Sequence, residues 1–308
     1  MLPIFAQAQT SSSLSEIINN LARTPLSKVL IFVLICTFVR MAMHRYLASV
    51  APHLRFGAYQ ILKRIDETAD ALVYAGVFVF FVIRPFVLQT FQIPSGSMVP
   101  TLLVKDMVIV NKAVYRYSDP KRGDIVVFRP PSWAVTPDQL DADNEVNVDF
   151  VKRCIGLPGD VVEVKNDDVY INGTKLDEPY KAFAEEIPNT NRELYRPLSE
   201  PEHQMHPKYD FKLVKLGGDY IPVYYSGDTF IDMLSVPKYQ NPLPDVRDAL
   251  MKAKPAPIPP GFYLMMGDNR YNSSDSRSWG LVPRESIVGR FQSVMFRSGV
   301  DRWFKVGY

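Results

Sequence analysis

The sequence predicts a mainly β protein: a barrel- or sandwich-like domain with a β-rich insertion, preceded by two transmembrane helices. Three observations lead to this fold class. Two long apolar stretches lie in the first third of the chain, and their lengths suit membrane helices. From Thr90 onward, short apolar runs alternate with turn residues. The 25 prolines among 308 residues favour loops, strand edges and turns over long helices.

The two apolar stretches predict two membrane spans. The first, Leu26–Met43, carries charge only at Lys28 and Arg40, from which long side chains can reach the bilayer surface. The second, Ala71–Ile83, carries none. Both stretches could instead be buried core helices, and the marginal first stretch leaves a single span open. We assign an N-terminal segment, a first span, a cytoplasmic loop and a second span to 1–24, 25–44, 45–69 and 70–89.

Basic residues orient these spans. The loop between the spans holds four of them, and the N-terminal side of the first span holds two. They are Arg45, Arg55, Lys63 and Arg64 in the loop, and Arg23 and Lys28 on the N-terminal side, with Lys28 at the start of the first span. The positive-inside rule therefore places the loop in the cytoplasm. We predict a multi-pass protein of a cytoplasmic membrane whose β domain lies on the extracytoplasmic side.

The β domain is predicted from 90–165 and 261–308, with the insertion at 166–260. Its strand-like runs are Met107–Val110, Ile125–Phe128, Phe150–Ile155, Val161–Val164, Val169–Ile171, Tyr263–Met266 and Ile287–Phe296. The dipeptide Asn172-Gly173 is typical of a hairpin turn. Because 13 of the 25 prolines lie in 179–260, we expect the insertion to be β-rich with many loops.

Composition and charge exclude several function classes. A net charge of +2 gives no support for a nucleic-acid partner. Neither Cys36 nor Cys154 lies in a metal-binding motif, so we predict no metal, no other cofactor and a free thiol at Cys154. The four histidines lie in the membrane region or the insertion, where they are badly placed for a Ser-His-Asp triad.

Two segments contain a candidate nucleophile and a candidate base. In 94–102, Gly96 lets the backbone turn and present the hydroxyl of Ser97, although the segment could also be a solvated loop. In the strand at 150–155, Lys152 shares a face with Phe150 and Cys154 and with no acid. Burial there would lower the pKa of Lys152, unless its amine reaches water. Without a suitable histidine, a lysine is the base expected for Ser97.

A third polar segment, 267–280, lies between two apolar runs. Asp275 and Arg277 could form a bidentate ion pair that fixes this loop, and Ser273 could orient a nearby amine. The alternative is a solvated surface loop.

Taken together, these segments resemble the signature boxes of bacterial type I signal peptidases, in the same order. The matching motifs are Phe91–Met98, Gly123–Val126, Lys152-Arg153 with the turn that follows, and the Gly267–Arg270 loop. The resemblance implies a membrane serine protease that acts as a monomer on the signal peptides of exported preproteins. The sequence departs from the family pattern at Tyr271, where many relatives carry Asp, and at Cys154, where a small aliphatic residue is common.

The resemblance also implies a role for each site residue. Ser97 matches the nucleophile and Lys152 the general base. The hydroxyl of Ser95 and the backbone amide of Ser97 match the oxyanion hole. Ser273 matches the residue that orients the lysine. The residues that match supporting positions of the site are Asp275, Arg277 and Gly267.

Six apolar residues match the lining of pockets for small side chains, usually alanine, one and three places before the cut. They are Phe91, Ile93, Met98, Leu102, Phe150 and Val151. They could equally pack in the core. We also expect the aromatic residues of Phe128–Trp133 and Trp303-Phe304 to touch the membrane interface, which lipid-borne fluorescence quenchers would detect.

Two other function classes compete with the protease. A self-cleaving repressor also uses a Ser/Lys dyad, but it would need a DNA-binding module where this chain has apolar stretches. A non-catalytic, membrane-anchored binding protein could use the same scaffold. The pH dependence of activity separates an enzyme from a binder.

Overall fold

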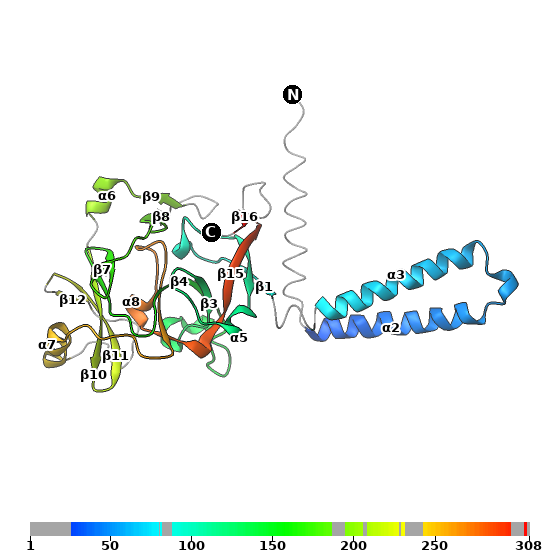
Figure 1. Cartoon of the computed structure of the whole chain (residues 1–308), viewed down its shortest axis with the longest axis horizontal. Coiled ribbons are helices and arrows are strands. Elements are labelled where there is room, and N and C mark those ends of the chain that lie inside the picture. Colours follow the sequence, from blue (N-terminus) through cyan, green and yellow to red (C-terminus); the bar gives the residue numbers. More distant parts are fainter. Residues whose placement is uncertain are drawn as a thin grey trace, which may run out of the picture. The chain divides into compact units, whose positions relative to one another are not determined.

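The computed structural model describes residues 26–79, 81, 88–186, 195–205, 208–227, 229–231, 243–296 and 305–306. The chain divides into two compact units, Met1–Thr90 and Phe91–Tyr308 (Figure 1). The N-terminal segment predicted at 1–24 and the dipeptide Trp303-Phe304 lie outside the described residues.

The first unit is a hairpin of two helices. Helix α2 (Leu26–Ser49) contains no Pro or Gly, and α3 (Ala58–Phe78) begins after Gly57, whose φ of 55° a side chain would disfavour. A short 3-10 turn, η2 (Pro52–Leu54), joins the two helices, which lie side by side. Within the described residues, Leu30–Ser49 is the one stretch long and apolar enough to cross a membrane. Two spans therefore remain a prediction, since 80 and 82–87 are not described.

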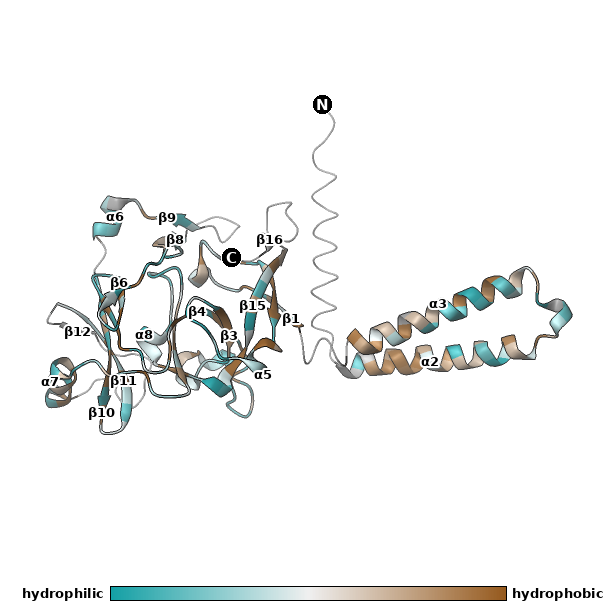
Figure 2. Ribbon diagram, viewed as in Figure 1, coloured by the Kyte–Doolittle hydropathy of each residue, from teal (hydrophilic) through white to brown (hydrophobic). Residues whose placement is uncertain are grey.

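Most of the predicted loop at 45–69 is helical, because α2 continues to Ser49 and α3 begins at Ala58. Charged side chains pair across the hairpin close to the two ends of this segment. The inter-helix pairs are Arg40–Asp70 at 2.6 Å and His44–Asp66 at 3.6 Å. Figure 2 shows both helices to be most apolar at the ends away from the turn. The charged parts of α2 and α3 thus support each other as helices.

The second unit contains an eight-stranded sheet in the order β1-β2-β15-β3-β4-β13-β14, with β16 paired to β15. Its strands are β1 (Leu88–Gln92), β2 (Met107–Asn111), β3 (Ile125–Phe128), β4 (Phe150–Gly156), β13 (Phe262–Met266), β14 (Val282–Pro283), β15 (Ile287–Phe296) and β16 (Lys305–Val306). Register shifts between β4 and β13, and between β15 and both β2 and β3, bend the sheet into a curl. The mainly β prediction is confirmed.

A six-stranded sheet has the order β12-β11-β10-β5-β6-β7, and β8 pairs with β9 in a separate ribbon. These strands are β5 (Val162–Lys165), β6 (Asp168–Ile171), β7 (Thr174–Lys175), β8 (Ala184–Glu186), β9 (Tyr195–Pro197), β10 (Asp210–Leu216), β11 (Asp219–Ser226) and β12 (Thr229–Ile231). The shorter helices are α5 (Val114–Tyr117), α6 (Glu200–Met205), α7 (Pro244–Lys252) and α8 (Ser276–Trp279). The segment 166–260 is thus rich in strands, and it shares this sheet with β5. Its boundaries as a separate domain stay a prediction.

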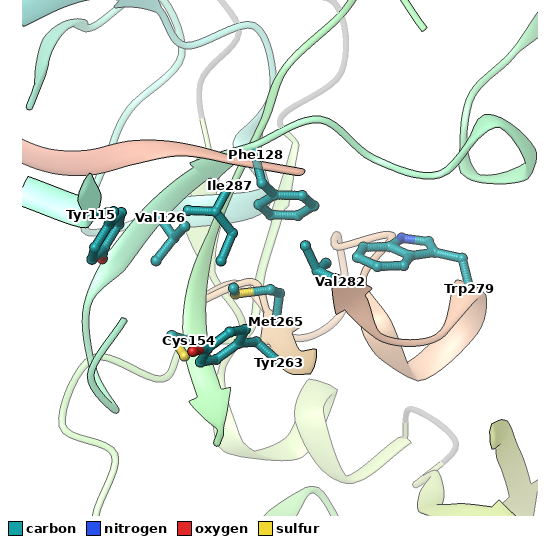
Figure 3. Packing of buried hydrophobic residues seen from close by; sticks show 9 residues of the cluster. All are labelled: Tyr115, Val126, Phe128, Cys154, Tyr263, Met265, Trp279, Val282 and Ile287. Atoms are coloured by element: carbon teal, nitrogen blue, oxygen red, sulfur yellow. The ribbon is translucent and has the colours of Figure 1, made fainter. Parts of the chain in front are cut away.

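Two of the core clusters of this unit show how its elements pack together. One surrounds the rings of Phe128 and Trp279, whose centroids are 5.9 Å apart (Figure 3). The other joins the sheets, because Ile155 of β4 packs with Val162 of β5 and Phe211 of β10. The expected membrane contact of Phe128 is wrong, because its side chain is fully buried. Trp133 is 46% exposed, and its indole N–H donates to the Trp279 carbonyl oxygen at 3.0 Å.

Truncation of Phe128 to alanine tests this core. We expect Phe128→Ala to lower the free energy of unfolding by about 3–5 kcal/mol, because a large buried ring leaves a cavity. Tyr117→Ala, at a side chain that is 90% exposed, is the control and should change it by less than about 0.5 kcal/mol. Denaturant unfolding of the detergent-solubilised chain measures both, and equal effects would contradict the assignment of Phe128 to the core.

Candidate active site

The site centres on a hydrogen bond between a serine and a lysine. Ser97 lies in the 3-10 turn η4 (Gly96–Met98), and Lys152 lies on β4. Lys152 Nζ is 2.6 Å from Ser97 Oγ, although the two residues are 55 positions apart. Ser97 is 7% exposed and Lys152 is 5% exposed. The serine hydroxyl therefore has an amine partner in a site that is nearly closed to water.

Burial sets the charge of this lysine. Desolvation is the main cause that lowers the pKa of Lys152 from 10.5 to about 8, with Arg277 adding to the effect and Asp275 opposing it. The ring centroid of Phe150 lies 5.6 Å from Nζ, as expected for a neighbour on the same strand face. The sequence predicts that the pKa of Lys152 is lowered. It does not predict the carboxylate of Asp275, which lies on another segment and raises this pKa.

The hydroxyl of Ser95 is close to the nucleophile. Its Oγ donates to Ser97 Oγ at 3.4 Å. Ser95 is extended, with φ of −139°, and the chain turns directly after it into η4. The Ser95 hydroxyl and the peptide unit of Ser97 are thus brought together at the start of this turn.

A buried bidentate ion pair acts electrostatically on the lysine. Arg277 Nε and Nη2 donate to the two carboxylate oxygens of Asp275, at 2.8 and 2.9 Å. Asp275 also accepts from the backbone N–H of Gly267 at 3.0 Å. Burial alone would raise the pKa of Asp275, but the charge and hydrogen bonds of Arg277 outweigh it and hold that pKa below its ordinary value. The pair expected from the sequence is therefore present as a buried charged unit.

Ser273 and Gly267 pack tightly against this pair. The Ser273 hydroxyl donates to Asp275 Oδ2 at 2.7 Å, while Lys152 Nζ donates to Ser97 Oγ. The hydroxyl of Ser273 thus contacts the supporting carboxylate. A Cβ on Gly267 would lie 2.2 Å from Ser273 Oγ and 2.5 Å from the Ser97 carbonyl oxygen, so only glycine fits there.

Sequence reasoning missed a second supporting pair. Arg153 Nε and Nη2 donate to the two oxygens of Asp268, at 2.8 and 2.6 Å, and Asp268 is fully buried. Asp268 Oδ2 also accepts from Thr101 Oγ1 at 2.5 Å. This carboxylate therefore joins β4, the segment after the nucleophile and the 267–280 loop. Arg153 is the neighbour of Lys152 in the sequence, but Asp268 is 115 positions away, so no local pattern could reveal the contact.

A third pair joins the predicted insertion to the same loop. Arg270 Nη1 donates to Glu178 Oε2 at 3.1 Å, and Nη2 contacts Oε1. Both side chains are almost fully buried. Within the described residues, no group of three or more His, Cys, Asp or Glu side chains is placed to hold a metal ion.

Comparison with known proteins identifies the family of this site. A family model described as "Signal peptidase, peptidase S26" matches residues 65–296, which include every site residue described above. The chain belongs to the signal peptidase family, peptidase S26. It is 36% identical over 231 residues to the signal peptidase I of Aquifex aeolicus, covering 70% of this chain and 78% of that protein.

Two further relatives support membership of the signal peptidase family. The probable signal peptidase I-2 of Synechocystis is 35% identical over 208 residues, covering 68% of this chain. The signal peptidase I of Pseudomonas fluorescens is 35% identical over 240 residues, covering 70% of this chain. The chain spans 63% and 66% of these two proteins, respectively.

The six residues that match signal peptidase pockets divide into two groups. Ile93, Met98 and Leu102 are buried in one core cluster. The half-buried members keep some exposed surface; they are Phe91, Phe150 and Val151. The first group has a clear packing role, and the second group keeps part of its surface exposed.

Replacement of the lysine by methionine tests the burial of its amine. The pKa of Lys152 is lowered from 10.5 to about 8, so burial of the charged amine lowers the free energy of unfolding by about 3 kcal/mol below pH 8. The lost hydrogen bond to Ser97 offsets about 1 kcal/mol of the gain. We expect Lys152→Met to raise the free energy of unfolding by about 2 kcal/mol at pH 7.

The pH dependence of this gain has a defined sign. Between pH 8 and 10.5 only the unfolded wild type keeps the proton, so wild-type stability rises with pH and the advantage of Lys152→Met disappears. Denaturant unfolding at pH 7 and pH 10.5 measures the difference. Lys175→Met, at an exposed side chain, is the control. A Lys152→Met advantage that does not change with pH would contradict a depressed lysine pKa.

Proposed function

We propose that this chain is a membrane-bound serine endopeptidase that removes N-terminal signal peptides from exported preproteins. The observation that carries the proposal is the 2.6 Å contact between the buried Lys152 amine and the Ser97 hydroxyl. Membership of the signal peptidase family and relatives named signal peptidase I support the same activity. A non-catalytic binding protein would have no use for a lysine whose burial costs stability.

In the proposed reaction, neutral Lys152 takes the proton of Ser97 Oγ as that oxygen bonds to the carbonyl carbon of the scissile peptide. The Ser95 hydroxyl and the Ser97 N–H stabilise the oxyanion. Lys152 then gives its proton to the leaving amine as the C–N bond breaks, which leaves an acyl-enzyme. The same amine deprotonates the water that hydrolyses this ester and restores Ser97.

One edge of β4 suits an extended substrate. Phe150, Val151 and Lys152 pair with β3 on one side, whereas in the described part of the chain the pairing with β13 on the other side begins at Arg153. An extended peptide could add to this edge beside the nucleophile. We propose that Phe150 and Val151, with Phe91, contact its side chains and favour small residues, usually alanine, one and three places before the cut.

The helix hairpin is proposed to anchor the enzyme in the bacterial cytoplasmic membrane. In this arrangement the predicted spans 25–44 and 70–89 cross the bilayer, the second ending before Leu88, where strand β1 begins. The segment 45–69 lies in the cytoplasm and the β unit is extracytoplasmic. The apolar Leu30–Ser49 segment supports the first span. We propose that the enzyme acts as a monomer, without metal, other cofactor or nucleic acid.

Cysteine labelling tests this topology. We expect Tyr117→Cys to react with a membrane-impermeant maleimide in spheroplasts, because the β unit faces outward. His53→Cys, in the turn of the hairpin, should react only after lysis. Both variants are made in a background where Cys36 and Cys154, the two free thiols of the chain, are replaced. Labelling of His53→Cys before lysis would contradict the two-span arrangement.

Cleavage of a preprotein with an Ala-x-Ala site tests the activity. We expect wild-type protein to cut after the second alanine, and Ser97→Ala and Lys152→Arg each to lose about 10³-fold or more in kcat/KM. Arginine keeps the charge but cannot act as a base near neutral pH. Ser118→Ala and Lys175→Arg, both at exposed positions, are the matched controls.

The pH profile completes this test. Because the base is the neutral amine, kcat/KM should rise with pH and level off above an apparent pKa near 8. Equal cleavage by all variants would assign the activity to another residue or to a contaminant. A folded wild type that cuts nothing would favour the non-catalytic binding protein.

A further inference from the structure

One peptide unit in the site carries both a proposed catalytic donor and a fixed acceptor. The Gly96–Ser97 peptide contains the Ser97 N–H, the backbone donor of the proposed oxyanion hole. In a trans peptide, this N–H and the Gly96 carbonyl lie in one plane and point in opposite directions. Gly96 O accepts from Asn269 Nδ2 at 3.2 Å and from the Val99 N–H at 3.1 Å. A donor that holds this oxygen therefore also sets the direction of the Ser97 N–H.

Asn269 is well suited to hold that peptide, because its own amide is fixed. Its side chain is fully buried. Oδ1 accepts from the Ala184 N–H at 3.0 Å, and Nδ2 donates to the Ala184 carbonyl at 2.9 Å. This pairing with one backbone unit determines which amide atom is oxygen and which is nitrogen. The backbone N–H of Asn269 also donates to the Ser97 carbonyl oxygen at 3.1 Å.

The β8–β9 ribbon supplies these contacts from outside the eight-stranded sheet. Ala184 is the first residue of β8, and Tyr195 is the first residue of its partner β9. A Cβ on Gly96 would lie 2.0 Å from Tyr195 Cζ, so the phenol ring packs directly on the glycine. Asn272 Nδ2 donates to the Tyr195 hydroxyl at 3.2 Å. Figure 1 shows β8 and β9 together at one edge of the unit, next to α6.

We propose that Asn269 is a positioning residue that orients the Ser97 N–H by holding the Gly96 carbonyl. Through Ala184 and Tyr195, the β8–β9 ribbon then forms part of the catalytic unit. Asn269 acts through the peptide unit and does not touch the substrate. The inference rests on the proposed peptidase function and gives the first part of the predicted insertion a role in the reaction.

The variant Asn269→Asp tests this positioning role most directly. The carboxylate keeps the shape of the side chain and an acceptor for the Ala184 N–H, but it has no hydrogen for the Gly96 or Ala184 carbonyls. Loss of an oxyanion-hole donor typically lowers kcat by about 10²–10³-fold, and a misoriented Ser97 N–H should lower kcat by less. We expect kcat to fall by about 10- to 100-fold, with KM changed by less than about 3-fold. Asn144→Asp, at an exposed turn, is the matched control.

A peptide aldehyde ending in alanine separates positioning from general loosening of the site. Ser97 Oγ bonds to the aldehyde carbon, the carbonyl π electrons move to oxygen, and the serine proton passes to Lys152. The oxyanion of this adduct is stabilised by the Ser97 N–H. The corresponding peptide amide, bound to the Ser97→Ala protein, forms no adduct and no oxyanion, so its affinity does not depend on that N–H. Asn269→Asp should weaken inhibition by the aldehyde at least about 10-fold and leave the Kd of the amide unchanged.

Two results would overturn the inference: unchanged inhibition by the aldehyde, or an equal loss of affinity for the aldehyde and the amide. If thermal unfolding shows that Asn269→Asp does not fold, Tyr195→Ala frees Gly96 without a change in the buried amide. It must show the same selective loss, and an unchanged aldehyde affinity would again overturn the inference. A wild type that neither cleaves nor binds the aldehyde would instead refute the proposed function.

Discussion

The site depends on a lysine amine that is kept away from water beside a serine hydroxyl. Water would restore the ordinary pKa of Lys152 and leave it protonated near neutral pH, unable to accept a proton. Burial on β4 and the ring of Phe150 remove that water. The same burial costs stability, so the surrounding structure has to hold the amine in an environment that it would not occupy on its own.

Buried ion pairs provide that support. Asp275–Arg277 and Arg153–Asp268 are both bidentate, which fixes geometry as well as charge. Each carboxylate has its own arginine, but both Asp275 and Asp268 still raise the pKa of Lys152, so desolvation has to outweigh them. Arg277 even lowers the pKa of Lys152, which partly offsets the opposite effect of Asp275. Asn269 extends the same scaffold to the backbone of the nucleophile turn.

Local features of this chain could be predicted from its sequence, and long-range pairings could not. The strands Ile125–Phe128 and Ile287–Phe296 follow from short apolar runs between turns, and the Asp275–Arg277 pair joins residues two positions apart. Contacts such as Arg153–Asp268 depend on how β4 and the 267–280 loop meet in space, which neither segment encodes alone. The loop expected at 45–69 is mostly helical because α2 and α3 both extend into it, and the pairs between these two helices lie close to its ends.

The most direct measurement is the titration of Lys152 itself in the detergent-solubilised chain. Lysine Cε carbons can be labelled with ¹³C and followed by NMR from pH 6 to pH 11, with Lys152→Met to assign the signal. The account predicts one resonance that titrates near pH 8 and is absent from the variant. A Lys152 resonance that titrates near 10.5 would contradict the account, because the amine would then be charged when it has to act as a base.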